Sequence, residues 1–584
     1  MTTPLTGRAW WIGCGLTFAL ALLVLMPTTG DFGVTYDEPA YRYSQMLSIQ
    51  WWERLAQVRS ANDLKPLLEP DALLYYWPYA RHGINFHPPL AGQLNLATYG
   101  LMGGWWKDIP ARRLATVLEF ALTVTVLFGF LARRYGAWVG ASAAGCLLLM
   151  PRLYGQAHLI DTDVPGLCLW ALASIAFWNG LYAPKRGRWR IALGILLGLA
   201  FVEKMGAVLV LLPILFWLAA ARLPKAFRGP ERLSCWVDAS LTLPVLLAPL
   251  ALAFVEILRL KTKLPPPQFT DLFVNRPASY LPGAGLALPL LLWLVRRALA
   301  RLFRSSPVWG TERPGLETLE AIIAFAPVVG WLGNPAWWRE TLPRLTHYYM
   351  LNTARRGALP DILILYLGQT YKYSLPWHNA WVLMAVTVPV LVLLMALVGL
   401  VRKLRTARTD ALPLFCLLNL LVLPVMRMLP TPAHDGVRLF LPSFFFLAAF
   451  AGWGIEGLSD LLARLARRPP RLFRAALMLL VLGDSAWQLW AIHPFELSYY
   501  NRLVGGPSGA WHRGFELTYW YDAFTPEVID QLNRKLPEGA YVTFMNDLSS
   551  PSTFQELQSL GHLRGDIHLE SPPGNDYPYA WLLT

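Results

Sequence analysis

The chain has 584 residues, of which 55% are hydrophobic and 15% are charged, and its mean hydropathy is +0.38. A soluble protein of this length would carry about 25% charged residues, so the composition excludes a soluble multidomain protein and indicates an all-α polytopic membrane protein. The net charge of +14 comes from short basic clusters between apolar runs, a distribution that sets membrane orientation and argues against a nucleic-acid partner.

Apolar runs approaching 20 residues predict membrane-spanning helices, and the chain contains about thirteen such runs. The predicted spans are Trp10–Met26, Arg112–Leu131, Ala137–Met150, Val164–Tyr182, Ile191–Val202, Ala207–Ala221, Val237–Ile257, Gly283–Ala300, Leu316–Leu332, Ala380–Val401, Ala411–Met428, Leu439–Leu458 and Leu472–Trp490. With the N-terminus inside, the basic clusters fall on the cytoplasmic side, with one exception at Arg259–Lys263. This threading predicts a long first outer loop, residues 27–111, and a C-terminus outside.

The first outer loop begins with the motif Thr35-Tyr36-Asp37-Glu38-Pro39. Adjacent carboxylates at a membrane surface repel each other and lose hydration, so they are unfavourable as purely structural residues. They suit a site in which Asp37 accepts a proton and Glu38 organises a polar substrate. The structural alternative is that Asp-Glu-Pro begins a surface helix, where acidic residues and proline are favoured.

Two further groups lie at the far end of the same loop. The segment Asn85-Phe86-His87-Pro88-Pro89-Leu90 occupies its second half, and Arg112-Arg113 stand at the mouth of the next predicted span. We interpret the segment from His87 to Trp106 as a helix lying in the membrane interface, because a further span there would break the charge alternation. The arginines are candidate substrate ligands, with interfacial anchoring as the alternative.

The second outer loop contains His158, Asp161 and Asp163, followed by an apolar run. An Asp-x-Asp pair is typical of metal and nucleotide-sugar sites in soluble enzymes, but either aspartate also fits the start of the next helix. We therefore expect a substrate-binding role for one of the two aspartates and helix capping by the other.

Charged residues also interrupt apolar stretches further along the chain. Glu203-Lys204 separates two short predicted spans, where a charge is costly unless it is paired or used. Lys204 is a candidate phosphate ligand, with a self-neutralising Glu-Lys pair as the alternative. His434 and Arg438 precede another span, and Arg438 is suited to clamp an anionic headgroup.

Acidic groups for proton transfer and basic groups for phosphate thus gather on one predicted side of the membrane. A transporter would instead place ionisable residues near the middle of the bilayer, and few of these residues lie there. The five cysteines are scattered, and their spacing indicates neither a metal site nor a disulfide framework.

The motif Thr35–Glu38, followed about fifty residues later by His87-Pro88-Pro89-Leu90, resembles the first lumenal loop of protein O-mannosyltransferases. It also resembles the bacterial transferase that adds aminoarabinose to lipid A. Both belong to the family 39-like C-type glycosyltransferases, which take a sugar from a polyprenyl-phosphate carrier. The resemblance implies the C-type glycosyltransferase fold, with about thirteen spans and an outward C-terminal domain, for this chain.

The resemblance also implies roles for the matching residues. Asp37 would be the general base that deprotonates the acceptor hydroxyl, and Glu38 would orient acceptor or sugar. The expected substrate-binding residues are His87, Arg112, Arg113, His158, Asp161, Asp163, Lys204, His434 and Arg438. No cofactor is implied, and the argument leaves room for a divalent metal without requiring one, because basic side chains can stabilise the departing phosphate.

After Trp490 the hydropathy falls, and a soluble tail follows. We predict a transmembrane glycosyltransferase domain over residues 1–491 and an extracytoplasmic α/β domain over 492–584. The latter would contain a helix near Pro526–Lys535, a strand near Tyr541–Met545 and a helix near Phe554–Leu560.

The sequence therefore predicts an inverting glycosyltransferase of the bacterial inner membrane, with its active site and C-terminus facing the periplasm. Its partners would be membrane lipid, a polyprenyl-phosphate-linked sugar donor and an acceptor that the sequence does not identify. A transporter or flippase of a lipid-linked sugar is the alternative from a different class, and a non-catalytic envelope scaffold is a third reading.

Overall fold

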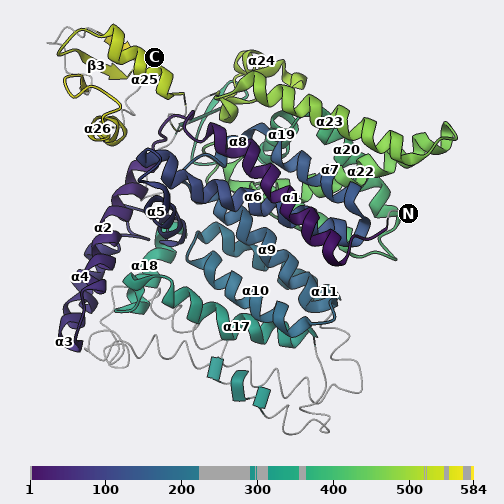
Figure 1. Cartoon of the computed structure of the whole chain (residues 1–584), viewed down its shortest axis with the longest axis horizontal. Coiled ribbons are helices and arrows are strands. Elements are labelled where there is room, and N and C mark those ends of the chain that lie inside the picture. Colours follow the sequence, from purple (N-terminus) through teal and green to yellow (C-terminus); the bar gives the residue numbers. More distant parts are fainter. Residues whose placement is uncertain are drawn as a thin grey trace.

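The protein is a mostly helical membrane protein (Figure 1). The computed structural model describes residues 3–221, most of 290–298, 314–353, 363–517, 520, 523–544, 551–569 and 581–583. Its long helices lie side by side, the first outer loop forms a helical arm on one side, and a small α/β unit lies beyond one end of that arm.

Six helices of the described residues are long and apolar enough to cross a membrane. They are α1 (Gly7–Leu25, continued by η1 at Met26–Thr28), α6 (Asp108–Tyr135), α9 (Asp163–Tyr182), α17 (Pro314–Leu332), α22 (Pro442–Leu465) and α23 (Pro470–Ile492). A seventh span results if α19 (Asn379–Thr387) and α20 (Val390–Arg405), which meet at an angle of 118°, cross together. The shorter apolar helices are α7 (Ala137–Leu148), η3 with α11 (Met205–Val210 and Leu211–Ala221) and α21 (Leu412–Met426).

The count of about thirteen spans is not confirmed and stays a prediction. Helices lie over the other predicted ranges, including α10 (Arg186–Phe201) over the predicted span Ile191–Val202. The predicted span Val237–Ile257 lies outside the described residues, and Gly283–Ala300 is described only in part. Length and composition alone thus support six or seven spans in the described part of the chain.

Local sequence explains where the longest helix, α6, begins and ends. Asp108 lies in its first turn and Arg133 and Arg134 in its last, which complements the helix dipole. The helix ends at Gly136, whose φ of 95° is costly for residues with a side chain. The chain then reverses directly into α7, so the two helices pack as neighbours.

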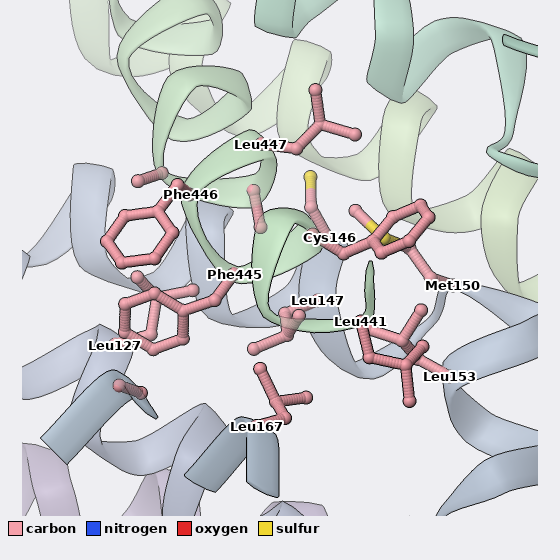
Figure 2. Packing of buried hydrophobic residues seen from close by; sticks show 14 of the residues in the cluster. Leu127, Cys146, Leu147, Met150, Leu153, Leu167, Leu441, Phe445, Phe446 and Leu447 are labelled. Carbon is pink, nitrogen blue, oxygen red and sulfur yellow. The ribbon is translucent and has the colours of Figure 1, made fainter. Parts of the chain in front are cut away.

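Apolar side chains from several helices form one continuous core (Figure 2). Leu127 of α6, Leu167 of α9 and Phe445 of α22 belong to it, and Figure 2 shows them close to one another. Glycines bring two of these helices unusually near: a Cβ built on Gly399 of α20 would overlap the Phe450 carbonyl oxygen of α22. Close helix approach at small residues is the usual mode of packing in membranes.

The first outer loop contains a helical arm of its own. Its elements are α2 (Glu38–Ala56), α3 (Ala61–Leu64), η2 (Lys65–Leu68), α4 (Pro70–Tyr76) and α5 (Leu90–Met102). Trp51 and Trp77 are buried in its core and pack edge to face at 5.4 Å between ring centroids. Trp338, which follows η4 (Pro335–Trp337), packs against Trp51 from a distant part of the sequence.

The remaining described elements are short. They are α8 (Pro151–Gln156), α18 (Thr341–Thr353), the antiparallel pair β1 (Leu363–Tyr366) and β2 (Gln369–Lys372), η6 (Arg438–Phe440), η7 (Glu496–Ser498), η8 (Arg502–Val504) and α24 (Gly506–His512). Strand β1 is joined to the tail, because Glu516 N–H donates to the Leu365 carbonyl oxygen.

The C-terminal unit is a small parallel sheet flanked by helices. Strands β3 (Tyr541–Phe544), β4 (His568–Leu569) and β5 (Trp581–Leu583) pair in the order β4-β3-β5, with helices α25 (Pro526–Lys535) and α26 (Pro551–Ser559). Helix α25, strand β3 and helix α26 occupy the ranges expected from the sequence, whereas β4 and β5 were not predicted. Its core also includes Val34 and Ile109, which come from the first outer loop and the start of α6. The division of the chain at residue 491 stays a prediction.

Candidate active site

Ionisable side chains from four distant segments converge at one end of the helices, together with one tryptophan from a fifth. They come from the start of α2, the start of α9, the turn after α10, the segment around η6 and Trp520 near the C-terminus. The first four segments each lie beside a helix end, so the helices bring them together, and Trp520 joins them from the segment between α24 and α25.

Asp37 occupies the N-cap position of α2. Its Oδ2 accepts a hydrogen bond from Trp520 Nε1 at 2.7 Å and one from Arg438 at 3.3 Å. About a third of the side chain (32%) stays exposed. Burial raises the pKa of Asp37 above its ordinary value, while Arg438 opposes the rise and Asp435 adds to it. A carboxylate with a raised pKa and one accessible oxygen is suited to accept a proton.

Arg438 links the two ends of the chain. Besides Asp37 it pairs with Asp435 at 2.6 Å, and its guanidinium lies 4.1 Å from the centroid of the Trp520 ring. Its Nε is buried and makes no hydrogen bond with any residue that the structure describes. The arginine thus retains an unused N–H donor, which is the feature expected of an anion ligand.

The second outer loop supplies Asp161 and Asp163. Asp161 Oδ1 caps α9 by accepting from the N–H groups of Asp163 (3.2 Å) and Val164 (3.4 Å). Its Oδ2 is buried and lacks a hydrogen-bond partner in the described part of the chain. Burial and the neighbouring Asp163 raise the pKa of Asp161 well above its ordinary value. The capping reading of the Asp-x-Asp pair therefore applies to Asp161, and a substrate-binding role for its second oxygen stays a prediction.

Asp163 and Lys204 form an ion pair between the start of α9 and the turn after α10. Lys204 is thus paired with Asp163, whereas the sequence suggested self-neutralisation by its neighbour Glu203. Glu203 is completely buried in the same turn, and both of its oxygens lack a hydrogen bond of standard geometry to any described residue. The Asp163–Lys204 pair faces Arg438, because Asp163 is among the charges that act on that guanidinium.

Glu38 lies next to Asp37 in sequence and points away from it into the protein. Its two oxygens accept hydrogen bonds from Arg113 Nε and Nη2, both at 2.8 Å, from Thr35 N–H at 2.7 Å and from Ile160 N–H at 2.9 Å. Arg113 also donates to the carbonyl oxygens of Phe32 and Gly33. The exposed fractions of Glu38 and Arg113 are 3% and 1%. This geometry fits a clamp that joins the backbone before Asp37 to the second outer loop at Ile160, with both carboxylate oxygens of Glu38 occupied.

His87 lies at the edge of the site. Its ring centroid is 6.1 Å from that of Tyr41, one helical turn after Asp37, and Tyr41 in turn faces Asp37 and Arg438. The backbone of the His87 motif is anchored by Leu90 N–H, which donates to the Val202 carbonyl oxygen beside Glu203. The two halves of the expected motif are thus brought together through Tyr41.

Three predicted ligands occupy other positions. Arg112 pairs with Asp108 at 2.6 Å and stacks on Tyr99, outside the Asp37 cluster. His158 is completely buried, with its ring nitrogens against the Tyr154 and Leu25 carbonyl oxygens, and burial lowers its pKa to about 4. His434 is buried beside Asp435 at 3.7 Å. The geometry assigns Arg112 and His158 to the scaffold and His434 to the support of Asp435.

Sequence reasoning missed Tyr41, Asp435 and Trp520. Tyr41 had a signal, since a residue four positions after Asp37 in a helix lies on the same face. Asp435 could have been found as the acidic neighbour of Arg438. Trp520 had none, because tryptophans are abundant and nothing in the sequence ties one of them to a residue 483 positions away. In the part of the chain that the structure describes, no group of three His, Cys, Asp or Glu side chains is arranged to hold a metal ion.

Comparison with known proteins gives one family match. Residues 87–247 match the family described as dolichyl-phosphate-mannose-protein mannosyltransferase. No curated protein sequence matches the chain.

Solved structures give weaker likenesses. The apo oligosaccharyltransferase of Archaeoglobus fulgidus aligns with a TM-score of 0.47 and 11% identity, over 97% of this chain and 65% of that one. Apo ArnT from Cupriavidus metallidurans aligns with a TM-score of 0.34 and 17% identity, over 96% of this chain and 85% of that one. The same ArnT bound to undecaprenyl phosphate aligns with a TM-score of 0.33. The chain spans less than two thirds of the archaeal protein's length.

The matched segment includes the His87 motif, both aspartates at the start of α9 and Lys204. Over residues 87–247 the chain is therefore similar to the dolichyl-phosphate-mannose-protein mannosyltransferase family.

Proposed function

We propose that the chain transfers a sugar from a polyprenyl-phosphate carrier to an acceptor hydroxyl at the outer face of the membrane, with inversion at the anomeric carbon. The observation that carries this proposal is the meeting of Asp37 and Arg438, 401 positions apart in sequence, beside the Asp163–Lys204 pair. A partly exposed carboxylate and partly buried cations at one site supply both charges that glycosyl transfer needs.

In this mechanism the acceptor hydroxyl gives its proton to Asp37 as its oxygen attacks the anomeric carbon. The bond from that carbon to the phosphate oxygen breaks, and the polyprenyl phosphate leaves with the bonding electrons. Arg438, through its unused Nε, and Lys204 stabilise the departing phosphate. Asp161 supplies a buried carboxyl oxygen for a sugar hydroxyl. Attack from the side opposite the leaving group accounts for inversion.

Glu38 and Arg113 act on this chemistry indirectly. Their four-point contact holds Thr35 and Ile160 on either side of the site, so that Asp37 and Asp161 face the same space. We propose a positioning role for both residues in place of direct contact with acceptor or sugar. His87 and Tyr41 would line the adjacent wall, where a sugar ring can pack against aromatic side chains.

The first test measures release of sugar from a panel of radiolabelled polyprenyl-phosphate sugars by the purified protein in nanodiscs. Asp37→Asn is expected to lower release from the accepted donor by about 10³-fold or more, because the base is lost while the shape is kept. Asp71→Asn, at an exposed position of the same loop, is the matched control and should retain activity.

Two other results would contradict the proposal. Tight donor binding without turnover by the unmodified protein would favour a transporter of lipid-linked sugar, which needs phosphate ligands and no base. Equal turnover by the unmodified protein and Asp37→Asn would show that another group accepts the proton.

A further inference from the structure

The C-terminal segment reaches the proposed base directly. Trp520 Nε1 donates to Asp37 Oδ2 at 2.7 Å, and Tyr36 N–H donates to the Trp520 carbonyl oxygen at 3.0 Å. Side chain and backbone of one residue therefore contact two successive residues of the Asp37 motif. Trp520 is 9% exposed, so this double contact is shielded from water.

Trp520 is held in a backbone conformation that needs support from its surroundings. Its φ of 68° lies in the left-handed region, which is uncommon and strained for a bulky residue. The Arg438 guanidinium packs 4.1 Å from the ring centroid and also bonds Asp37 at 3.3 Å. The three side chains thus form a closed triangle in which each contacts the other two.

The segment around Trp520 leads into the C-terminal α/β unit, which is docked on the helical arm of the first outer loop. Helix α26 lies against α2 (Figure 1), and Glu556 of α26 pairs with Arg42 of α2 at 2.8 Å. Val34 and Ile109 of the membrane part are buried in the core of the C-terminal unit. Trp520 is therefore held both by its own contacts with Asp37 and Tyr36 and by the docking of the C-terminal unit on α2.

We propose that Trp520 is a positioning residue of the transferase site, which with Arg438 engages Oδ2 of Asp37 and leaves Oδ1 to take the proton of the acceptor hydroxyl. This inference rests on the proposed role of Asp37 as the base. It makes the C-terminal segment part of the catalytic centre, so that the base is correctly oriented only when that segment is in place.

The proposal has a measurable consequence for proton affinity. A neutral N–H donor stabilises the ionised carboxylate, so the indole opposes the effect of burial on Asp37. The charged and titratable groups that face Asp37 are Arg438 and Asp435 from the segment before α22 and Tyr41 from α2. Asp161 and Asp163 face Tyr41 from the start of α9. Removal of the indole N–H leaves all of these unchanged.

Trp520→Phe keeps a ring beside Arg438 and removes only the donor. The acid limb of the pH profile of sugar transfer is expected to move up by about one pH unit, because a hydrogen bond to a carboxylate is lost. At pH values above the limb the rate should recover most of its unmodified value, with little change in KM for the donor. A purely structural role would lower the rate at every pH and leave the limb in place.

A second readout does not depend on turnover. Carbodiimide couples an amine to protonated carboxyls, so the pH midpoint of Asp37 labelling, followed by peptide mass spectrometry, reports its protonation in the intact protein. The midpoint should rise by the same amount in Trp520→Phe, and Asp37→Asn should show no labelling at this position. Trp511→Phe, a change at an exposed tryptophan of α24, is the matched control and should shift neither quantity.

The outcomes separate this inference from the proposed function. If Trp520→Phe moves neither the acid limb of the pH profile nor the midpoint of Asp37 labelling, the positioning role is overturned. A higher transfer rate at every pH would overturn it as well, because the indole would then obstruct the site. A raised midpoint in a protein that turns over no donor would support the contact and overturn the proposed function. If Trp520→Phe melts at a lower temperature, Trp520→Tyr, which restores a donor, should return the midpoint toward the unmodified value.

Discussion

Glu38 is a buried charge that is paired within the protein. All of its hydrogen bonds come from donors of the protein, two of them from Arg113 and two from backbone N–H groups. Both side chains are almost completely shielded from solvent. Breaking a buried pair by removing one partner leaves the other charge uncompensated, and this is strongly destabilising.

Glu38→Gln is therefore expected to destabilise the protein by about 3 kcal/mol. The new amide group would also turn one acceptor into a donor that faces N–H groups. Thermal unfolding in detergent should show a lower melting temperature, together with a fall in transfer activity. Glu53→Gln, at an exposed position of α2, should change neither. Lost activity with an unchanged melting temperature would instead support the direct contact with substrate expected from the sequence.

The sequence identified the chemistry of the site better than its geometry. Asp37, Asp163, Lys204 and Arg438 lie in or beside one cluster, because each follows or precedes a predicted span on the same side. The sequence could not tell which of two adjacent residues faces the site. Asp37 and Glu38 differ only by where α2 begins, and that turn is set by Arg113, 75 positions away.

At the scale of elements, hydropathy was sufficient to find most helices and insufficient to count spans. Helices such as α7 and α10 are short, and the α19–α20 pair is bent by 118°. Whether a short or broken helix crosses a bilayer depends on its neighbours, which a hydropathy pattern does not contain. The lengths of apolar runs therefore predicted positions more accurately than topology.

Helix packing gives a prediction of its own at Gly454 of α22. A Cβ built there would overlap the Met395 carbonyl oxygen of α20, so alanine requires the two helices to separate. Gly454→Ala should therefore lower the free energy of unfolding by about 1–3 kcal/mol, a cost typical of overpacking. The measurement is the melting temperature in one detergent at fixed protein concentration.

Gly483→Ala on α23 provides the matched control for this change. Outside its own helix backbone, no atom of the described residues lies within 4 Å of a Cβ built on Gly483, so alanine is accommodated. Its better helix propensity should leave the melting temperature unchanged or higher. Equal effects of the two substitutions would show that the α20–α22 contact is looser than the structure indicates.

At the scale of the whole molecule, the C-terminal unit is joined to the membrane part by more than a chain connection. Arg42 of α2 pairs with Glu556 at 2.8 Å and with Asp108 at 3.2 Å, and Asp108 also pairs with Arg112. This chain of charges runs from α26 to the start of α6. Helix α25, strand β3 and helix α26 could be predicted from the sequence, but this docking could not, because no local pattern identifies a partner so far along the chain.

Glu556→Gln removes one end of this series of ion pairs and should loosen the docking of the C-terminal unit without unfolding the helix bundle. Both side chains of the pair are mostly buried, so the loss should be about 1 kcal/mol of docking free energy, or about fivefold faster cleavage by a protease that attacks the undocked unit. Because Trp520 depends on the same docking, transfer activity should fall and its acid limb should move in the direction expected for Trp520→Phe.

Glu527→Gln, at an exposed position of α25, is the matched control and should leave the cleavage rate and the pH profile unchanged. Faster cleavage with an unmoved acid limb would mean that Trp520 holds Asp37 independently of the C-terminal unit, and would confine catalytic support to the segment around residue 520.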